Sequence, residues 1–147
     1  MPSGTLTQAQ SDKVTKLVIE EGVTQIGDSA FRGMDYLGSV SLPNSVTSIE
    51  AYAFFECELL KNVSFAKGLI GELAFYKCKL SEVILPEGLT SLGYYAFLLN
   101  TKLKKVEIPS SLSVINTGDF SKCDALREIV IPEGVERIES GAFSDCK

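Results

Sequence analysis

The sequence predicts a repeat solenoid of about six units, each roughly 23 residues long. Three observations support this prediction: a recurring Ala-Phe pair, a short apolar strand pattern before each pair, and a proline that closes four of the strands. The pairs are Ala30-Phe31, Ala53-Phe54, Ala74-Phe75, Ala96-Phe97 and Ala142-Phe143, with Asp119-Phe120 in the remaining unit. The steps between these phenylalanines are 23, 21, 22, 23 and 23 residues, so six of the eight Phe share one structural position.

Each unit opens with an apolar-x-apolar triplet, which is the period-2 pattern of a short strand. The triplets are Leu17-Val18-Ile19, Val40-Ser41-Leu42, Val63-Ser64-Phe65, Val83-Ile84-Leu85, Val106-Glu107-Ile108 and Ile129-Val130-Ile131. Proline follows four of them, at Pro43, Pro86, Pro109 and Pro132. Proline ends a strand because it has no N–H for the ladder. Stacked units would place these strands in parallel, about 4.8 Å apart.

The rest of each unit predicts a turn, a second apolar pair and a short helical stretch. The pair lies three residues apart, as at Val46 and Ile49, and shrinks to Leu69 and Leu73 in the third unit. The stretch from Ala-Phe to the following Leu is short, so we expect one helical or 3₁₀ turn there. The third unit is itself shortened, which predicts a tighter coil and a local change of curvature.

Composition and charge exclude several classes of function. The chain has 147 residues, a net charge of −5 and no histidine. Nucleic-acid binding needs a positive stripe, which is absent. The missing histidine removes Ser-His-Asp and Cys-His nucleophiles and the usual zinc ligands. No apolar run reaches the ~18–20 residues that cross a bilayer. We therefore expect no enzyme activity, no catalytic residue, no cofactor, no metal and no membrane insertion.

The unit Leu-x-x-Val-x-Ile-Pro-x-x-Val-x-x-Ile-x-x-x-Ala-Phe-x-x-Cys resembles the BspA-type leucine-rich repeat, found in surface proteins of gut bacteria and some parasitic protozoa. The resemblance covers residues 16–147 and implies a right-handed solenoid that serves adhesion or protein binding, with no catalytic residues. Departures from the pattern are Asp119 for Ala, and Met34 and Asn100 for Cys. The opening residues resemble the lead-in of such arrays. We expect residues 1–15 to be an N-terminal lead-in or cap, and 16–147 to be a solenoid truncated at its C-terminus, with any signal or anchor outside this fragment.

Two features of the interior need an explanation. Cys57, Cys78, Cys123 and Cys146 share the position three residues after Phe. We expect buried thiols that act as small hydrophobes, with Cys57–Cys78 and Cys123–Cys146 disulfides as the alternative, although parallel side chains suit that bond poorly. Asp119 should face inward, where a carboxylate is costly unless hydrogen-bonded. Local rotation of the coil or backbone amides would satisfy it, and a ligand or ion contact is the alternative.

Two surfaces are candidates for binding. Bulky residues gather beside the Ala-Phe pairs of units two to four: Tyr52, Phe55, Tyr76, Tyr94, Tyr95, Leu98 and Leu99. Exposed apolar patches often mark interfaces, and the alternative is that these side chains lie flat over a thin core. The second candidate is the centre of the strand face: Val18, Ser41, Ser64, Ile84, Glu107 and Val130.

These observations predict a non-catalytic binding module of a cell-surface or secreted protein. It would mediate adhesion or protein recognition through a rigid repeat surface, with a protein or glycan partner on a host or neighbouring cell. A structural spacer that presents a neighbouring domain is the alternative, and an accessory domain of a secreted enzyme is a more distant one. We also expect self-association through the uncapped C-terminal coil.

Overall fold

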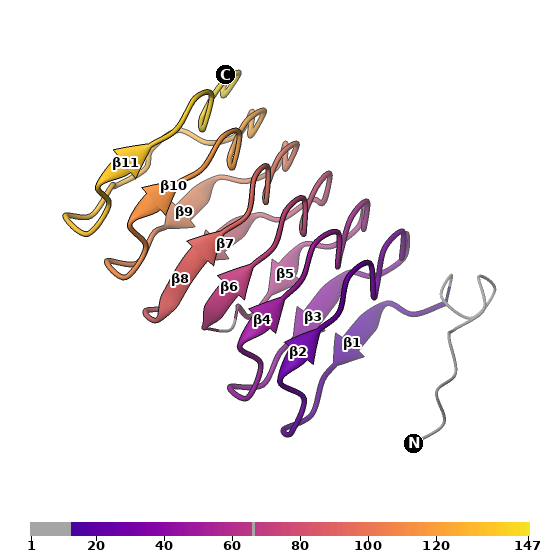
Figure 1. The fold of residues 1–147 in the computed structure, drawn as a ribbon. Helices are drawn as coiled ribbons and strands as arrows, with labels where there is room; N and C mark the ends of the chain where they lie inside the picture. The colour runs from indigo at the N-terminus through magenta and orange to yellow at the C-terminus, as the bar shows by residue number, and fades with distance from the viewer. Residues whose placement is uncertain (1–12, 66) are drawn as a thin grey trace.

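A computed structural model describes residues 13–65 and 67–147, which form a column of stacked coils (Figure 1). We number the coils one to six by their phenylalanines at the turn that we call the edge: Phe31, Phe54, Phe75, Phe97, Phe120 and Phe143. The predicted lead-in falls mostly on residues 1–12, outside the described residues. The parallel-strand solenoid predicted from the repeat is confirmed.

The predicted strands form the first sheet, and all its pairings are parallel. Its strands are β1 (Lys16–Val18), β3 (Ser39–Ser41), β5 (Asn62–Val63), β7 (Glu82–Ile84) and β9 (Lys105–Glu107). Equivalent residues stack in register, as Leu17, Val40 and Val63 do. The strands begin one residue earlier than predicted. The strand predicted at 129–131 is wrong, because a single bridge between Val130 and Glu107 joins that segment to β9.

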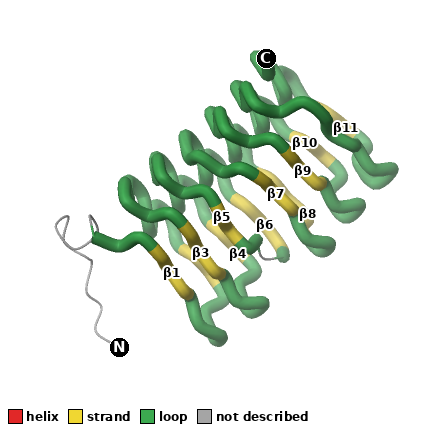
Figure 2. The backbone as a smooth tube through the Cα atoms, turned by 180° about the vertical axis from the view of Figure 1, so that it is seen from behind, coloured by secondary structure: helices red, strands yellow, loops and turns green. Residues whose placement is uncertain are grey.

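A second parallel sheet, which the sequence did not predict, follows the turn in each coil (Figures 1 and 2). Its strands are β2 (Gln25–Ile26), β4 (Ser48–Ile49), β6 (Gly68–Ile70), β8 (Leu89–Leu92), β10 (Val114–Ile115) and β11 (Arg137–Ile138). Outside coil three, the second residue of each predicted apolar pair lies in these strands. In coil three the assignment is wrong: Ile70 takes the core position, while Leu69 is exposed.

The predicted helical turn at the edge is also wrong, since no helix of any type occurs in residues 13–65 and 67–147. The residues two before and two after each edge Phe have φ between 53° and 68°. A right-handed helix requires negative φ, so these residues divide the edge into two successive tight turns. The edge has its own ladder across the coils, in which the N–H of Phe54 donates to Ala74 O at 2.8 Å and the N–H of Phe75 to Ala96 O at 2.9 Å.

The edge phenylalanines, which share one repeat position, stack on one another in the core. Neighbouring ring centroids lie 5.2–5.5 Å apart, with interplanar angles of 3° to 19°. Phe65 meets two rings of the stack edge-on, Phe75 at 5.3 Å and Phe97 at 5.7 Å. Phe65 therefore helps to fill the core beside the shortened coil.

Each sheet is interrupted once, at different boundaries between coils. The first sheet divides between β5 and β7, at the shortened coil three, while the second sheet passes that point with a bulge at Gly68 and Leu69. The second sheet divides between β8 and β10. Side chains bridge this second gap: the Asn116 amide donates to Leu92 O, and Ser111 Oγ donates to Leu89 O at 2.8 Å. We call the two gaps the first-sheet break and the second-sheet break.

Candidate functional site

The bulky residues predicted to gather beside the Ala-Phe pairs do lie together at the edge of coils two to four. We call them the edge patch: Tyr52, Phe55, Tyr76, Tyr94, Tyr95, Leu98 and Leu99. They come from stacked turns rather than from a strand, so their backbones are fixed by the edge ladder. The N–H of Leu73, for example, donates to Tyr94 O at 3.0 Å. The patch is therefore carried by a hydrogen-bonded scaffold.

Part of the edge patch is a second aromatic stack outside the core. The Phe55 and Tyr76 rings lie 4.6 Å apart at 15°, and the Arg32 guanidinium covers Phe55 at 4.7 Å from its centroid. Tyr52 meets Phe55 at 5.6 Å and 57°. These rings are half-buried. Phe55 therefore lies between the Arg32 guanidinium and the Tyr76 ring.

Coil four carries the open part of the patch. Tyr94 is 54% exposed and Tyr95 is 38% exposed. The Tyr95 ring lies over Gly118, since a Cβ atom added there would stand only 2.3 Å from the ring. Tyr95 therefore lies partly flat over the next coil, which is the alternative considered for these side chains. More than half of Tyr94, in contrast, faces solvent.

The backbone beneath the patch is one that bulky residues seldom adopt. Tyr52, Leu73 and Tyr95 occupy the position two before the edge Phe and have φ of 55°, 53° and 61°. Coils five and six have glycine at that position, Gly118 and Gly141. A left-handed backbone costs a bulky residue about 1 kcal/mol or more relative to glycine. Coils two to four therefore hold large side chains where small ones would be less strained.

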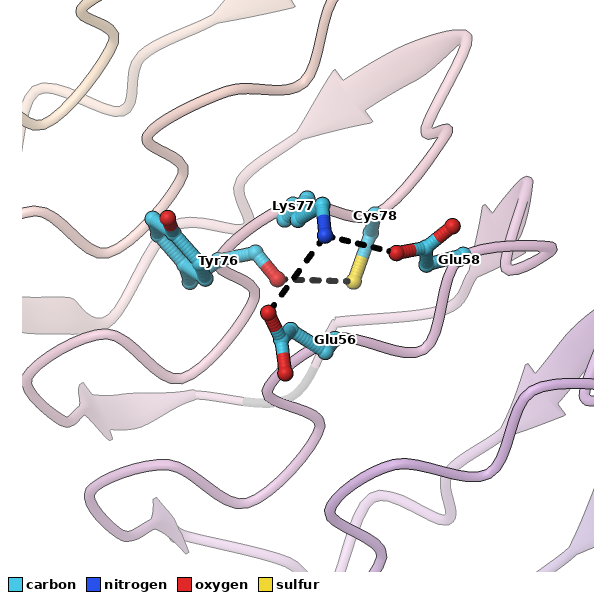
Figure 3. A network of polar contacts seen from close by, with 5 residues as sticks. All are labelled: Glu56, Glu58, Tyr76, Lys77 and Cys78. Atoms are coloured by element: carbon cyan, nitrogen blue, oxygen red, sulfur yellow. Dashed lines mark hydrogen bonds and ion pairs between the residues drawn. The ribbon is translucent and has the colours of Figure 1, made fainter.

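The charged groups at this edge are partly neutralised. Lys77 reaches between two carboxylates of the preceding coil, 3.4 Å from Glu56 and 2.7 Å from Glu58 (Figure 3). The hydrogen bond and charge of Lys77 lower the pKa of Glu58. Glu72 lies in the same coil as Lys77, and its exposed carboxylate forms no ion pair or hydrogen bond with the described residues. Glu72 was not predicted as a site residue, although the sequence shows that it lies three residues before the edge Phe of its coil.

The strand face, the second candidate, is exposed but divided. Val18, Ile84 and Val130 are all about half exposed or more, with Val130 at 72%. Ser41, Ser64 and Glu107 are also exposed, and Glu107 pairs with Lys105. The first-sheet break separates the column formed by these residues into two parts. A hollow of about 590 Å³ opens where the last coil leaves β9, lined in part by Glu107 and Val130.

The cysteine column has a polar role that the sequence did not reveal. All four cysteines are free. Each thiol donates to the carbonyl oxygen of the edge Phe one coil earlier, at 3.1–3.6 Å. Asn100 takes the same position in coil four, donates to Phe75 O and Phe97 O, and accepts the N–H of Leu80. The column therefore satisfies carbonyls inside the core. Burial raises the pKa of Cys57 to about 11 and of Cys123 to about 12.

Asp119 is held by backbone amides, as one of the predicted explanations required. Its carboxylate accepts the N–H of Asn116 at 2.7 Å and of Ala96 at 3.4 Å. In the neighbouring coils the residue equivalent to Asn116 donates its N–H to the coil before it, as Gly93 does to Ile70 O at 2.7 Å. At the second-sheet break the side-chain amide of Asn116 donates to Leu92 O instead, and the backbone N–H of Asn116 donates to Asp119. Burial raises the pKa of Asp119 to about 7.

Neither a metal centre nor a membrane span appears in the part of the chain that the structure describes. No three His, Cys, Asp or Glu side chains in residues 13–65 and 67–147 are grouped to hold an ion. The same residues contain no helix of the length and apolarity that a bilayer requires. The geometry offers surfaces and a rigid scaffold for binding.

Solved structures with the same architecture come from several bacteria. A leucine-rich cell surface protein from Faecalibacterium prausnitzii is 31% identical, with a TM-score of 0.75 over 92% of this chain and 36% of that one. The pneumococcal vaccine antigen PcpA is 25% identical, with a TM-score of 0.77 over 92% and 39%. A leucine-rich repeat protein from T. pallidum is 26% identical, with a TM-score of 0.69 over 96% and 84%. The chain thus spans less than half the length of the first two.

The sequence itself carries the repeat signature of one family. Six copies of the BspA type leucine-rich repeat region match residues 8–70 and 68–147. No curated protein sequence matches the chain. The family match spans almost the whole chain and agrees with the stacked coils, the edge phenylalanines and the parallel strands. The chain belongs to the BspA-type leucine-rich repeat family.

Proposed function

We propose that this chain is a non-catalytic binding module of a cell-surface or secreted protein, and that it recognises a protein partner through the edge patch. Family membership and the similarity to the leucine-rich cell surface protein from Faecalibacterium prausnitzii support the general role. One observation supports the choice of surface: Tyr52, Leu73 and Tyr95 have a left-handed backbone where coils five and six have glycine. Strained residues that persist often serve a function.

The chemistry of the patch favours a protein over a glycan. Tyrosine combines a large contact area with a polar tip and few rotamers to freeze. Phe55 is covered by Tyr76 and by the Arg32 guanidinium, so its ring offers no open face to a sugar ring. The ring edges and hydroxyl groups of the edge patch suit the mixed side chains of a protein surface.

Adhesion to cells tests this proposal. Beads coated with the purified chain should attach to epithelial cells, and Tyr94→Ala with Tyr95→Ala should reduce attachment at least about tenfold, as for hot-spot residues. Thermal unfolding should change little for Tyr94→Ala, because that side chain is 54% exposed, and somewhat more for Tyr95→Ala, because its ring covers Gly118. Attachment equal to that of the unmodified chain would exclude the edge patch as the binding surface.

The strand face is the second candidate, favoured by the hollow of about 590 Å³ beside Val130. Val130→Asp and Ile84→Asp place a charge on that face without touching the edge patch. Loss of attachment in these variants alone would move the site to the strand face. If all four variants attach normally, the spacer alternative gains support.

A further inference from the structure

The column three residues before the edge Phe borders the patch and combines two kinds of side chain. Its members, in coil order, are Asp28, Ala51, Glu72, Tyr94, Thr117 and Ser140. Glu72 and Tyr94 are neighbours in coils three and four, and the Leu73 N–H donates to Tyr94 O at 3.0 Å. Equivalent positions on paired turns project side by side, so a carboxylate and an aromatic ring leave the surface next to each other.

Both groups lack a partner within residues 13–65 and 67–147. Tyr94 joins no ring stack and no cation–ring contact there. Glu72 has no ion pair, whereas Glu56 and Glu58, one coil earlier, share Lys77. An exposed ring and a free carboxylate therefore stand together beside the apolar part of the patch.

An arginine side chain matches this pair better than other common side chains. Its planar guanidinium donates two parallel hydrogen bonds to a carboxylate and also stacks on an aromatic face. A lysine ammonium is a compact, strongly hydrated charge and lacks that planar double contact. The same edge already places a guanidinium on a ring, since Arg32 covers Phe55 at 4.7 Å. The net charge of −5 also favours a basic partner.

We infer that Glu72 and Tyr94 form a two-point socket for an arginine side chain of the partner protein. This inference rests on the proposed function, because it assigns the chemistry recognised at one end of the edge patch. The carboxylate supplies the charge and direction, and the ring supplies a face that excludes water from one side of the guanidinium.

Short basic peptides test the socket without knowledge of the partner. Fluorescein-labelled nona-arginine and nona-lysine are titrated with the purified chain, and binding is followed by fluorescence anisotropy at about 150 mM salt, where long-range attraction is screened. Nona-arginine should bind at least about threefold more tightly than nona-lysine. Glu72→Gln and Tyr94→Ala should each weaken nona-arginine binding about five- to tenfold and abolish its advantage.

Two matched variants control for charge and for exposed tyrosine. Glu133→Gln removes one exposed carboxylate in the turn that precedes β11, and Tyr36→Ala removes a ring that is 53% exposed, close to the 54% of Tyr94. Each should change binding less than about twofold. Circular dichroism confirms that all four variants keep the fold.

The outcomes separate the socket from the proposed function. Equal binding of the two peptides, or equal losses in Glu72→Gln and Glu133→Gln, would show attraction by net charge alone and overturn the socket. If Tyr94→Ala with Tyr95→Ala still abolishes cell attachment in that case, the proposed function stands without it. Arginine preference that is lost only in the Glu72 and Tyr94 variants supports the socket, even where cell attachment is unchanged.

Discussion

Asp119→Asn should make the free energy of unfolding of this protein depend much less on pH than it does in the unmodified chain. Burial raises the pKa of Asp119 from an ordinary 3.8 to about 7. That difference of about three units corresponds to roughly 4 kcal/mol, at 1.36 kcal/mol per unit. Because the folded protein binds this proton more tightly than the unfolded chain, the contribution is complete below about pH 4. It is lost as the pH rises to about 7.

The asparagine variant carries no charge at this position at any pH, and its single carbonyl oxygen can still accept the Asn116 N–H. Urea unfolding followed by tyrosine fluorescence from pH 4 to pH 8 gives the free energy of unfolding for both proteins. Asp119→Asn should gain about 4 kcal/mol relative to the unmodified chain across this range. This is a large part of the ~5–15 kcal/mol that stabilises a typical domain.

The exposed Asp124 controls for the change in net charge. Asp124→Asn should follow the pH dependence of the unmodified chain. If the difference between Asp119→Asn and the unmodified chain varies by less than about 1 kcal/mol between pH 4 and pH 8, burial does not govern the ionisation of Asp119. The inference that burial outweighs the two backbone hydrogen bonds to Asp119 would then be refuted.

Three further predictions concern the core. Phe75→Ala should lower the free energy of unfolding by about 3–5 kcal/mol because its ring stacks on two neighbours, while Arg32→Ala should cost about 1 kcal/mol or less; equal losses in urea unfolding would contradict the stacking. Asn100→Leu should cost about 2–4 kcal/mol because it leaves Phe75 O and the Leu80 N–H without partners and leaves Phe97 O with the Cys123 thiol alone. Asn100→Cys should recover part of that loss, and equal stability of the two variants would argue against a donor role for the column. Iodoacetamide at pH 8 should modify Cys146 well before Cys78, because burial raises the pKa of Cys78 and hinders access; equal rates by peptide mapping would indicate that the column opens in solution.

Most of the fold can be predicted from the repeat, because six phenylalanines at one period leave little choice of architecture. The second sheet was missed for a physical reason. Its strands are mostly two residues long, and a strand as short as Ser48–Ile49 exists only through its hydrogen bonds to the coils on either side. The apolar spacing of Val46 and Ile49 reflects a turn followed by a strand, and this combination has no simple period.

The edge was predicted as a helical turn because its length suits one. The positive φ values at Tyr52 and Glu56 could not be expected from residue type, since such side chains seldom adopt that backbone. Gly118 and Gly141 were the available signal. Two glycines at the same repeat position indicate a left-handed backbone, which extends to every coil.

The candidate site was predicted in part. The sequence placed the bulky residues on adjacent coils, and the structure brings them together. It could not show that Phe55 and Tyr76 cover each other whereas Tyr94 stands free, since side-chain direction depends on the unusual edge backbone. Glu72 was not predicted, because its repeat position holds residues of mixed type and shows no apolar pattern. Similarly, Asn100 among cysteines was a readable sign that this buried position needs a hydrogen-bond donor.

The two interruptions of the sheets give the column an uneven stiffness. Coil four is fastened to coil three by the second sheet and the edge ladder, and to coil five by the first sheet and the edge ladder. One sheet is interrupted on each side of coil four, so the column bends more easily at these two breaks than elsewhere. The continuous sheet and the edge ladder still resist separation of the coils. Tension on the molecule would therefore tilt coil four first. Glu72 and Tyr94 lie on either side of the first-sheet break. Mechanical force would therefore alter the distance between their side chains and the lifetime of any partner contact that uses both.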